Sequence, residues 1–186
     1  MGEAMKNVTA ILSILSILLI LVISCKDEVV GPEENIRSYI NDEFGFKISV
    51  PDGWELEENI DIGGYEALVL GSKTKYSGTQ PKFNVIGQDV GFELDANSLL
   101  QASVKNLPNM LNEFKLDSKR VVDIDQFQCA EVIFHHNYNG ITLKQRQLLF
   151  MCRPSKFIVI TFDSAMNEYV RNSSDFDKIQ ESIKKL

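Results

Sequence analysis

The segment Lys156–Phe162 limits the folds open to this chain more than any other stretch. Successive side chains of a strand point to opposite faces of the sheet. One face carries Phe157, Val159 and Thr161, and the other carries Ile158, Ile160 and Phe162. Because both faces are largely apolar, the segment is predicted to be a central strand that other elements cover on both sides.

Other stretches with strand-like alternation flank this one along the chain. They lie at 46–50, 54–57, 65–72, 81–90, 118–124, 127–138 and 141–152. Asn139-Gly140 separates the last two and is a strong signal for a two-residue type I′ hairpin. Hairpin connections make a mostly antiparallel sheet.

Two helices are predicted, one in the middle of the chain and one at its end. The first spans 97–114 and carries one apolar stripe, with Asp95 or Asn97 as its N-terminal cap. Pro108 lacks an N–H group, so a kink or break is expected near 104–108. The second helix is predicted to begin near Ser174. Helices on both sides of a central strand predict an α+β protein, an α/β/α sandwich around a mostly antiparallel sheet of about six to seven strands.

This order of elements resembles the PsbP-like family, which includes a photosystem subunit, a yeast Ran-binding import factor and many bacterial lipoproteins. The resemblance is carried by Phe46–Trp54, which gives the opening strand, turn and tryptophan, and by the closing strand Phe157–Phe162 and helix Phe176–Leu186. It covers the whole domain at 44–186. Since members share a fold and differ in function, the resemblance implies the fold and leaves the activity open.

The N-terminus carries an export signal. Lys6 precedes an uncharged run, Val8–Ile23, which is short for a membrane span and suits the apolar region of a signal peptide. The run ends in Leu21-Val22-Ile23-Ser24-Cys25, which resembles the lipobox of bacterial lipoproteins. Residues 1–24 are therefore predicted to be removed, leaving Cys25 to bear the lipid anchor, with fatty-acyl chains such as palmitate. A retained N-terminal membrane helix is the alternative.

A polar, acidic segment follows the cysteine. Residues 25–43 are interpreted as the lipidated cysteine and a flexible tether, with a short helical turn at 33–40. Lys26-Asp27-Glu28 resembles a surface-export signal of Bacteroidetes lipoproteins, and a plain solvated tether is the alternative. The predicted location is the bacterial cell envelope, at the outer membrane, on either its periplasmic or its outer side.

The net charge of the chain limits the classes of molecule that it can bind. The net charge is −7, and an acidic domain is repelled by nucleic acid and by anionic lipid headgroups. We therefore expect no nucleic-acid partner, membrane contact through the anchor alone, and an envelope protein as partner. The oligomeric state is left open.

The two histidines are adjacent, at His135 and His136, and would point to opposite faces of one strand. A tight turn at Asn139-Gly140 places His135 opposite Lys144, with Glu131 on the same face. A metal held by Glu131 and His135 would lie beside a lysine and lack further ligands, so structural or surface histidines are favoured over a metal site.

Two cysteines, Cys129 and Cys152, remain after lipidation of Cys25. The hairpin register sets Cys129 opposite Phe150, with Cys152 diagonal to it, near the limit that a disulfide can span. Free, buried thiols are favoured, and a disulfide is the alternative. A nucleophilic cysteine is disfavoured because no histidine lies on a suitable element.

The remaining candidates are interpreted as structural. Trp54 follows a turn into a strand and is assigned to the core, while Gly63-Gly64 and 71–80 lack the features of a phosphate loop. A solvated edge is assigned to the acids Asp42, Glu43, Glu55, Glu57 and Glu58. No catalytic residue, cofactor site or metal site is assigned. The leading hypothesis is a non-enzymatic, lipid-anchored binding or assembly module, and the alternative is a small-molecule carrier or an enzyme whose site is not recognisable from sequence.

Overall fold

The structure is a computed structural model that describes residues 37–62, 65–72 and 80–186. The predicted signal peptide at 1–24, Cys25 and Lys26-Asp27-Glu28 lie outside the described residues, as do Gly63-Gly64 and 73–79. Within the described part, no helix is long and apolar enough to cross a membrane.

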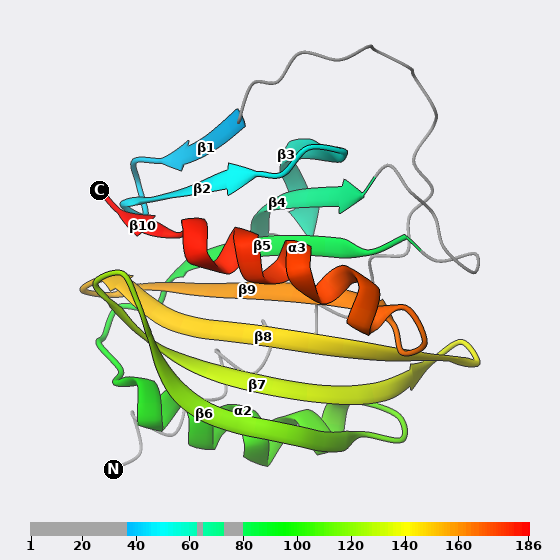
Figure 1. The fold of residues 1–186 in the computed structure, drawn as a ribbon. Coiled ribbons are helices and arrows are strands. Elements are labelled where there is room, and N and C mark those ends of the chain that lie inside the picture. The colour runs from blue at the N-terminus through cyan, green and yellow to red at the C-terminus, as the bar shows by residue number, and fades with distance from the viewer. Residues whose placement is uncertain (1–36, 63–64, 73–79) are drawn as a thin grey trace.

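A seven-stranded sheet forms the centre of the fold (Figure 1). Its strands, in spatial order, are β3 (Trp54–Ile62), β4 (Tyr65–Ser72), β5 (Lys82–Asp89), β9 (Lys156–Ala165), β8 (Ile141–Arg153), β7 (Phe127–Tyr138) and β6 (Lys115–Ile124). Every neighbouring pair is antiparallel. β9 lies in the middle of the order, and Phe157–Phe162 are fully buried on both faces, as the sequence predicts.

A second, three-stranded sheet packs beside the first. It consists of β2 (Phe46–Val50) between β1 (Arg37–Asn41) and β10 (Lys184–Lys185). β1 falls inside the predicted tether, and residues 37–40 form a strand where a helical turn was expected. The physical reason is that β2 offers a free edge, and Tyr39 of β1 packs its ring against Phe46 at 6.1 Å between centroids.

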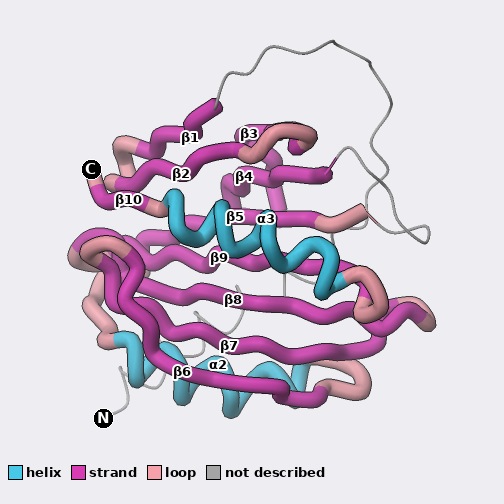
Figure 2. Tube along the Cα trace, viewed as in Figure 1, coloured by secondary structure: helices cyan, strands magenta, loops and turns pink. Residues whose placement is uncertain are grey.

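The two helices lie on opposite sides of the large sheet (Figure 2). α3 (Tyr169–Ser182) joins one hydrophobic cluster with Ile158 and Ile160, and α2 (Ala96–Met110) joins another with Phe157 and Val159. This arrangement confirms the α/β/α sandwich.

Two helix boundaries differ from the predictions. Of the kink or break expected near 104–108, the break is wrong: α2 runs unbroken through Pro108 and ends at Met110. Proline lacks only the hydrogen bond that its own N–H would donate to residue 104, and near the end of the helix this loss does not stop the last turn from forming. Asp95 is the cap, accepting a hydrogen bond from the Ser98 N–H at 2.8 Å. α3 begins at Tyr169 and not near Ser174, because buried Asn172 forms a 2.8 Å bond to Ser164 and extends the inward face beyond the apolar stripe.

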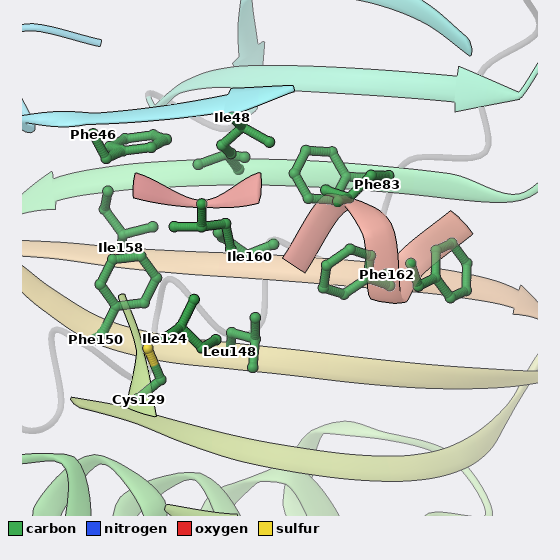
Figure 3. Packing of buried hydrophobic residues seen from close by; sticks show 14 of the residues in the cluster. Phe46, Ile48, Phe83, Ile124, Cys129, Leu148, Phe150, Ile158, Ile160 and Phe162 are labelled. Atoms are coloured by element: carbon green, nitrogen blue, oxygen red, sulfur yellow. The ribbon is translucent and has the colours of Figure 1, made fainter. Parts of the chain in front are cut away.

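The larger core lies between the sheet, α3 and β2 (Figure 3). Trp54 belongs to this core as predicted: it is 1% exposed, its ring meets Phe176 edge-on, and its indole N–H donates to Asp175 Oδ2 at 3.2 Å. The Asn139-Gly140 turn has positive φ at both residues and aligns Tyr138 with Ile141, confirming the type I′ hairpin. The core therefore fixes the strand register on which the candidate site depends.

Candidate functional site: a charged cluster beside helix α3

Charged side chains gather on the face of β6, β7 and β8 that also carries α3. We call this group the charged cluster; its members are Asp117, Arg120, Glu131, His135, Lys144, Arg146, Tyr169 and Asp177. Figure 1 shows α3 crossing this side of the sheet near β9, with β8, β7 and β6 extending beyond it. The cluster therefore combines groups from three strands and one helix.

The hairpin register brings the sequence candidates together. His135 is the cross-strand partner of Lys144, as predicted, and Glu131 lies on the same face. His136 points to the opposite face, where it is 1% exposed. Burial lowers the pKa of His136, so it is a neutral core residue and cannot share a ligand with His135.

Asp117 joins two cationic or potentially cationic side chains of neighbouring strands. Its carboxylate bonds to His135 Nδ1 at 2.9 Å and to Lys144 Nζ at 2.8 Å. The register of β6 against β7 shifts between Leu116 and Ser118, and this irregularity places Asp117. Partial burial opposes ionisation of Asp117, but the bonds from Lys144 and His135 outweigh it and hold its pKa below the ordinary value.

Glu131 is the most deeply buried acid of the cluster, with a side chain that is 1% exposed. Its Oε2 accepts a hydrogen bond from Arg120 Nε at 2.5 Å, and the Arg120 side chain is 63% exposed. Its Oε1 has no hydrogen-bond partner among the described residues. A buried carboxylate oxygen without a partner costs free energy, so Glu131 has capacity for one more donor.

Arg146 anchors the cluster to α3. It donates to Asp177 at 2.6 Å and to Gln180 at 3.1 Å. Burial opposes its charge, but the bond to Asp177 and the neighbouring Tyr169 outweigh this and raise its pKa. Arg146 Nε has no hydrogen-bond partner within the part of the chain that the structure describes.

Tyr169 closes the cluster at the start of α3. Lys144 Nζ lies 5.0 Å from the centre of its ring, a cation–π distance. Burial raises the pKa of Tyr169, against the opposing effect of nearby Arg146. Although Arg146 is close, the Tyr169 hydroxyl has no partner in hydrogen-bonding geometry among the described residues. After Glu131 Oε1 and Arg146 Nε, the Tyr169 hydroxyl is the third polar group of the cluster without a hydrogen-bond partner among the described residues.

The two thiols lie in the core and are free. This agrees with the favoured sequence interpretation and not with the disulfide alternative. Burial raises the pKa of Cys129 to about 12 and that of Cys152 to about 11, so neither carries appreciable thiolate at neutral pH. A nucleophilic role would need the thiolate, and these positions disfavour it.

The ionic side chains of the cluster neutralise one another in pairs. Asp117 holds both His135 and Lys144, and Arg120 neutralises Glu131, so these groups are held in ion pairs. Across residues 37–62, 65–72 and 80–186, no three side chains of His, Cys, Asp or Glu come together as a metal site. Other sequence candidates lie elsewhere: Asp42, Glu43, Glu55 and Glu57 are exposed, and the Glu58 side chain is not described.

Sequence reasoning found part of the cluster and missed the rest. Arg146 lies two residues after Lys144 on the same strand, so the hairpin register could have placed it. Asp117 depends on the irregularity in β6, which leaves no clear signal in the sequence. Tyr169 and Asp177 come from α3, whose packing on the sheet cannot be counted from a turn.

Comparisons with known proteins give the fold. No protein-family profile matches the chain, and no curated protein sequence matches it. Among solved structures, the cyanobacterial PsbP (CyanoP) of Synechocystis is 14% identical with a TM-score of 0.60, covering 89% of this chain and 99% of that chain.

Two further structures resemble the chain at similar levels. LpqN, described as involved in cell envelope biogenesis of Mycobacterium tuberculosis, is 17% identical with a TM-score of 0.56, covering 75% of this chain and 82% of that chain. A protein of unknown function from Pseudomonas aeruginosa is 13% identical with a TM-score of 0.58, covering 78% of this chain and 94% of that chain. At these identities the likeness shows the fold alone: the chain has a PsbP-like fold.

Proposed function

We propose that this protein is a lipid-anchored lipoprotein of the bacterial cell envelope that acts as a non-enzymatic binding or assembly module. The lipobox at Leu21–Cys25 supports the anchor. A fold shared with LpqN, a protein described as involved in cell envelope biogenesis, is in keeping with an envelope location. The proposed location of the protein is the outer membrane, with the domain on its periplasmic or outer side.

The charged cluster is the observation that carries the binding role. It presents exposed charges of both signs, with the Arg120 side chain 63% and the Asp177 side chain 55% exposed. Behind them lie the polar atoms of Glu131, Arg146 and Tyr169 that have no partner in the described structure. Groups of this kind at a protein interface fix orientation and select the partner. We therefore assign the cluster as the contact surface for an envelope protein.

The test is capture of the tagged, intact lipoprotein from a detergent extract, with paired variants. Arg120→Gln with Glu131→Gln removes one ion pair of the cluster without leaving a buried charge unpaired. The matched control is Lys184→Gln with Asp125→Asn, which removes an ion pair of 3.7 Å that lies outside the cluster.

We expect a partner to be recovered with the native chain and the control variant, and lost with the cluster variant and with a Cys25-deleted chain. Equal recovery by both double variants would contradict the assignment of the cluster. If the native chain recovers no partner beyond what the Cys25-deleted chain recovers, the proposal that the protein is a binding module is contradicted.

A small-molecule carrier is the second candidate, and the unused oxygen of Glu131 favours it. A ligand that donates a hydrogen bond to this carboxylate should bind less well to Glu131→Gln. Saturation-transfer NMR with a mixture of amines and amino acids distinguishes it: signals lost in this variant support a carrier, and the absence of any signal excludes ligands of these classes.

A further inference from the structure

One edge of the large sheet is open along β6. This strand is the last in the order of the sheet, and β7 is its only neighbouring strand in the described part of the chain. The register with β7 shifts between Leu116 and Ser118 and then runs without interruption from Ser118 to Ile124. Figure 1 shows β6 at the end of the sheet farthest from β3, with α3 near β9 and away from this edge. We call the stretch 118–124 the free edge.

Backbone N–H and C=O groups along the free edge face away from β7. A two-residue turn joins Ile124 to Phe127, so these two residues are a hydrogen-bonded pair of the hairpin. Bonded and non-bonded pairs alternate along an antiparallel ladder. Counting back from Ile124, the backbone groups of Lys119, Val121 and Asp123 therefore point outward. Among the described residues, none of these groups bonds to another loop or turn.

The side chains of the free edge match their own sequence read in the opposite direction. Lys119 and Asp123 lie two residues to either side of Val121, on the same face of the strand. Both are exposed, and neither forms an ion pair within the described ranges. When two copies of β6 pair antiparallel with Val121 opposite Val121, each Lys119 lies opposite Asp123 of the other copy. The three residues with outward backbone groups are the same three that meet.

Other registers of the same pairing fit less well. A shift by one residue sets outward backbone groups against inward ones. A shift by two residues in one direction places Asp123 opposite Asp117 of the other copy, at the irregular part of β6. A shift by two residues in the other direction carries Lys119 past the end of the strand. The register about Val121 therefore has the most backbone bonds and the best match of charge.

The charges of β6 also bear on whether its edge is protected. Exposed edge strands commonly carry charged side chains or bulges that prevent pairing with another chain. In β6 the bulge lies before Ser118, outside the free edge. On the other face, Arg120 lies opposite Val122 of the second copy, and each Arg120 is already held by its own Glu131. The free edge thus brings opposite charges together and does not repel a second copy.

We infer that the free edge, residues 118–124, is an interface between two copies of this chain, in which two β6 strands pair antiparallel about Val121 and join the two large sheets into one. The residues that set the register, Lys119, Val121 and Asp123, are not members of the charged cluster. The inference therefore goes beyond the partner surface proposed above. Because a single strand pair buries a small area, the two copies associate reversibly.

The experiment is disulfide trapping of the full chain in detergent after Val121→Cys, with copper–phenanthroline as the oxidant and non-reducing electrophoresis as the readout. Register partners on antiparallel strands lie about 5.5 Å apart between Cα atoms, within the range of a disulfide. Ser118→Cys is the matched control on the same strand, because its two copies would lie about 20 Å apart. Cys129 and Cys152 are buried and do not compete.

We expect the Val121→Cys chain to cross-link about tenfold faster than the Ser118→Cys chain. Adding Lys119→Asp to Val121→Cys should slow the reaction about fivefold, because two contacts between acids replace two contacts between lysine and aspartate. Adding Asp123→Lys as well exchanges both charges and should restore the rate. Since both side chains are exposed, these variants should unfold at the same temperature as the native chain.

Equal rates for Val121→Cys and Ser118→Cys would overturn the inference, and would leave the edge to a strand of another protein. A rate unchanged by Lys119→Asp, or not restored by the charge exchange, would also overturn it. Capture of an envelope partner depends on the charged cluster and should be the same for Lys119→Asp as for the native chain. Failure of this interface is therefore distinguishable from failure of the proposed function.

Discussion

Arg120 and Glu131 are register partners on β6 and β7, and their ion pair joins a mostly exposed guanidinium to a carboxylate that is 1% exposed. The pair is asymmetric: Arg120 gives up little hydration, whereas Glu131 gives up nearly all of it. The buried member therefore depends on the exposed member for its charge to be tolerated.

Arg120→Gln should destabilise the domain by about 1–3 kcal/mol, because it leaves the buried Glu131 carboxylate without its cationic partner. Adding Glu131→Gln to this variant should recover part of the loss, since an amide is less costly to bury than an unpaired charge. Urea unfolding measures both. If Arg120→Gln alone is as stable as the native chain, the Arg120–Glu131 ion pair contributes nothing to the free energy of unfolding.

Asp163 makes stability depend on pH. Burial raises its pKa from the ordinary 3.8 to about 7 in the folded state, so the folded state binds more protons than the unfolded state between these values. The contribution of Asp163 to the free energy of unfolding is most favourable below about pH 4. This contribution declines as the pH rises towards 7, by at most about 4 kcal/mol.

Asp163→Asn should remove this decline and be more stable than the native chain at pH 8. Thermal unfolding from pH 4 to 8 tests it. An equal difference in unfolding temperature between the native chain and Asp163→Asn at pH 4 and at pH 8 would contradict this prediction.

The two core thiols should react slowly with alkylating reagents in the folded chain. Burial shields them and raises the pKa of Cys129 to about 12 and of Cys152 to about 11. In urea without reductant, mass spectrometry should find both alkylated. Failure of both to react until a reductant is added would instead demonstrate a disulfide.

Pro108 lies inside the last turn of α2 and is exposed. Pro108→Ala should add about 1–2 kcal/mol of stability, because alanine restores an N–H donor and removes a steric clash. Gln101→Ala, at an exposed position of the same helix, is the control and should change stability by less than about 0.5 kcal/mol. A Pro108→Ala chain less stable than the native one would mean that the proline stabilises the end of the helix.

The hairpin and the central strand were predictable because each has a local cause. Asn139-Gly140 fixes a two-residue turn, and every pair from Tyr138–Ile141 to His135–Lys144 follows by counting. Phe157–Phe162 has apolar side chains on both faces, so other elements had to pack on both sides of the strand, and this predicted the α/β/α sandwich. By contrast, β1 forms because β2 has a free edge far from any turn signal, and the early start of α3 depends on one hydrogen bond between Asn172 and Ser164.

The candidate sites were harder to predict for the same reason. His135, Lys144 and Glu131 share one hairpin and were placed correctly. Asp117 was not found, because its place depends on the register shift between Leu116 and Ser118 of β6, which has no clear signal in the sequence.

The lipid anchor is the central claim, and the mass of the mature N-terminus tests it most directly. The full chain should be expressed in bacteria, extracted from membranes and analysed by intact-mass and N-terminal peptide spectrometry, with Cys25→Ala as the control. We predict a mature chain that begins at Cys25 and carries a diacylglyceryl adduct, and a Cys25→Ala chain that lacks the adduct and leaves the membrane. A mature chain that begins at Met1, or a Cys25 without lipid, would contradict the account.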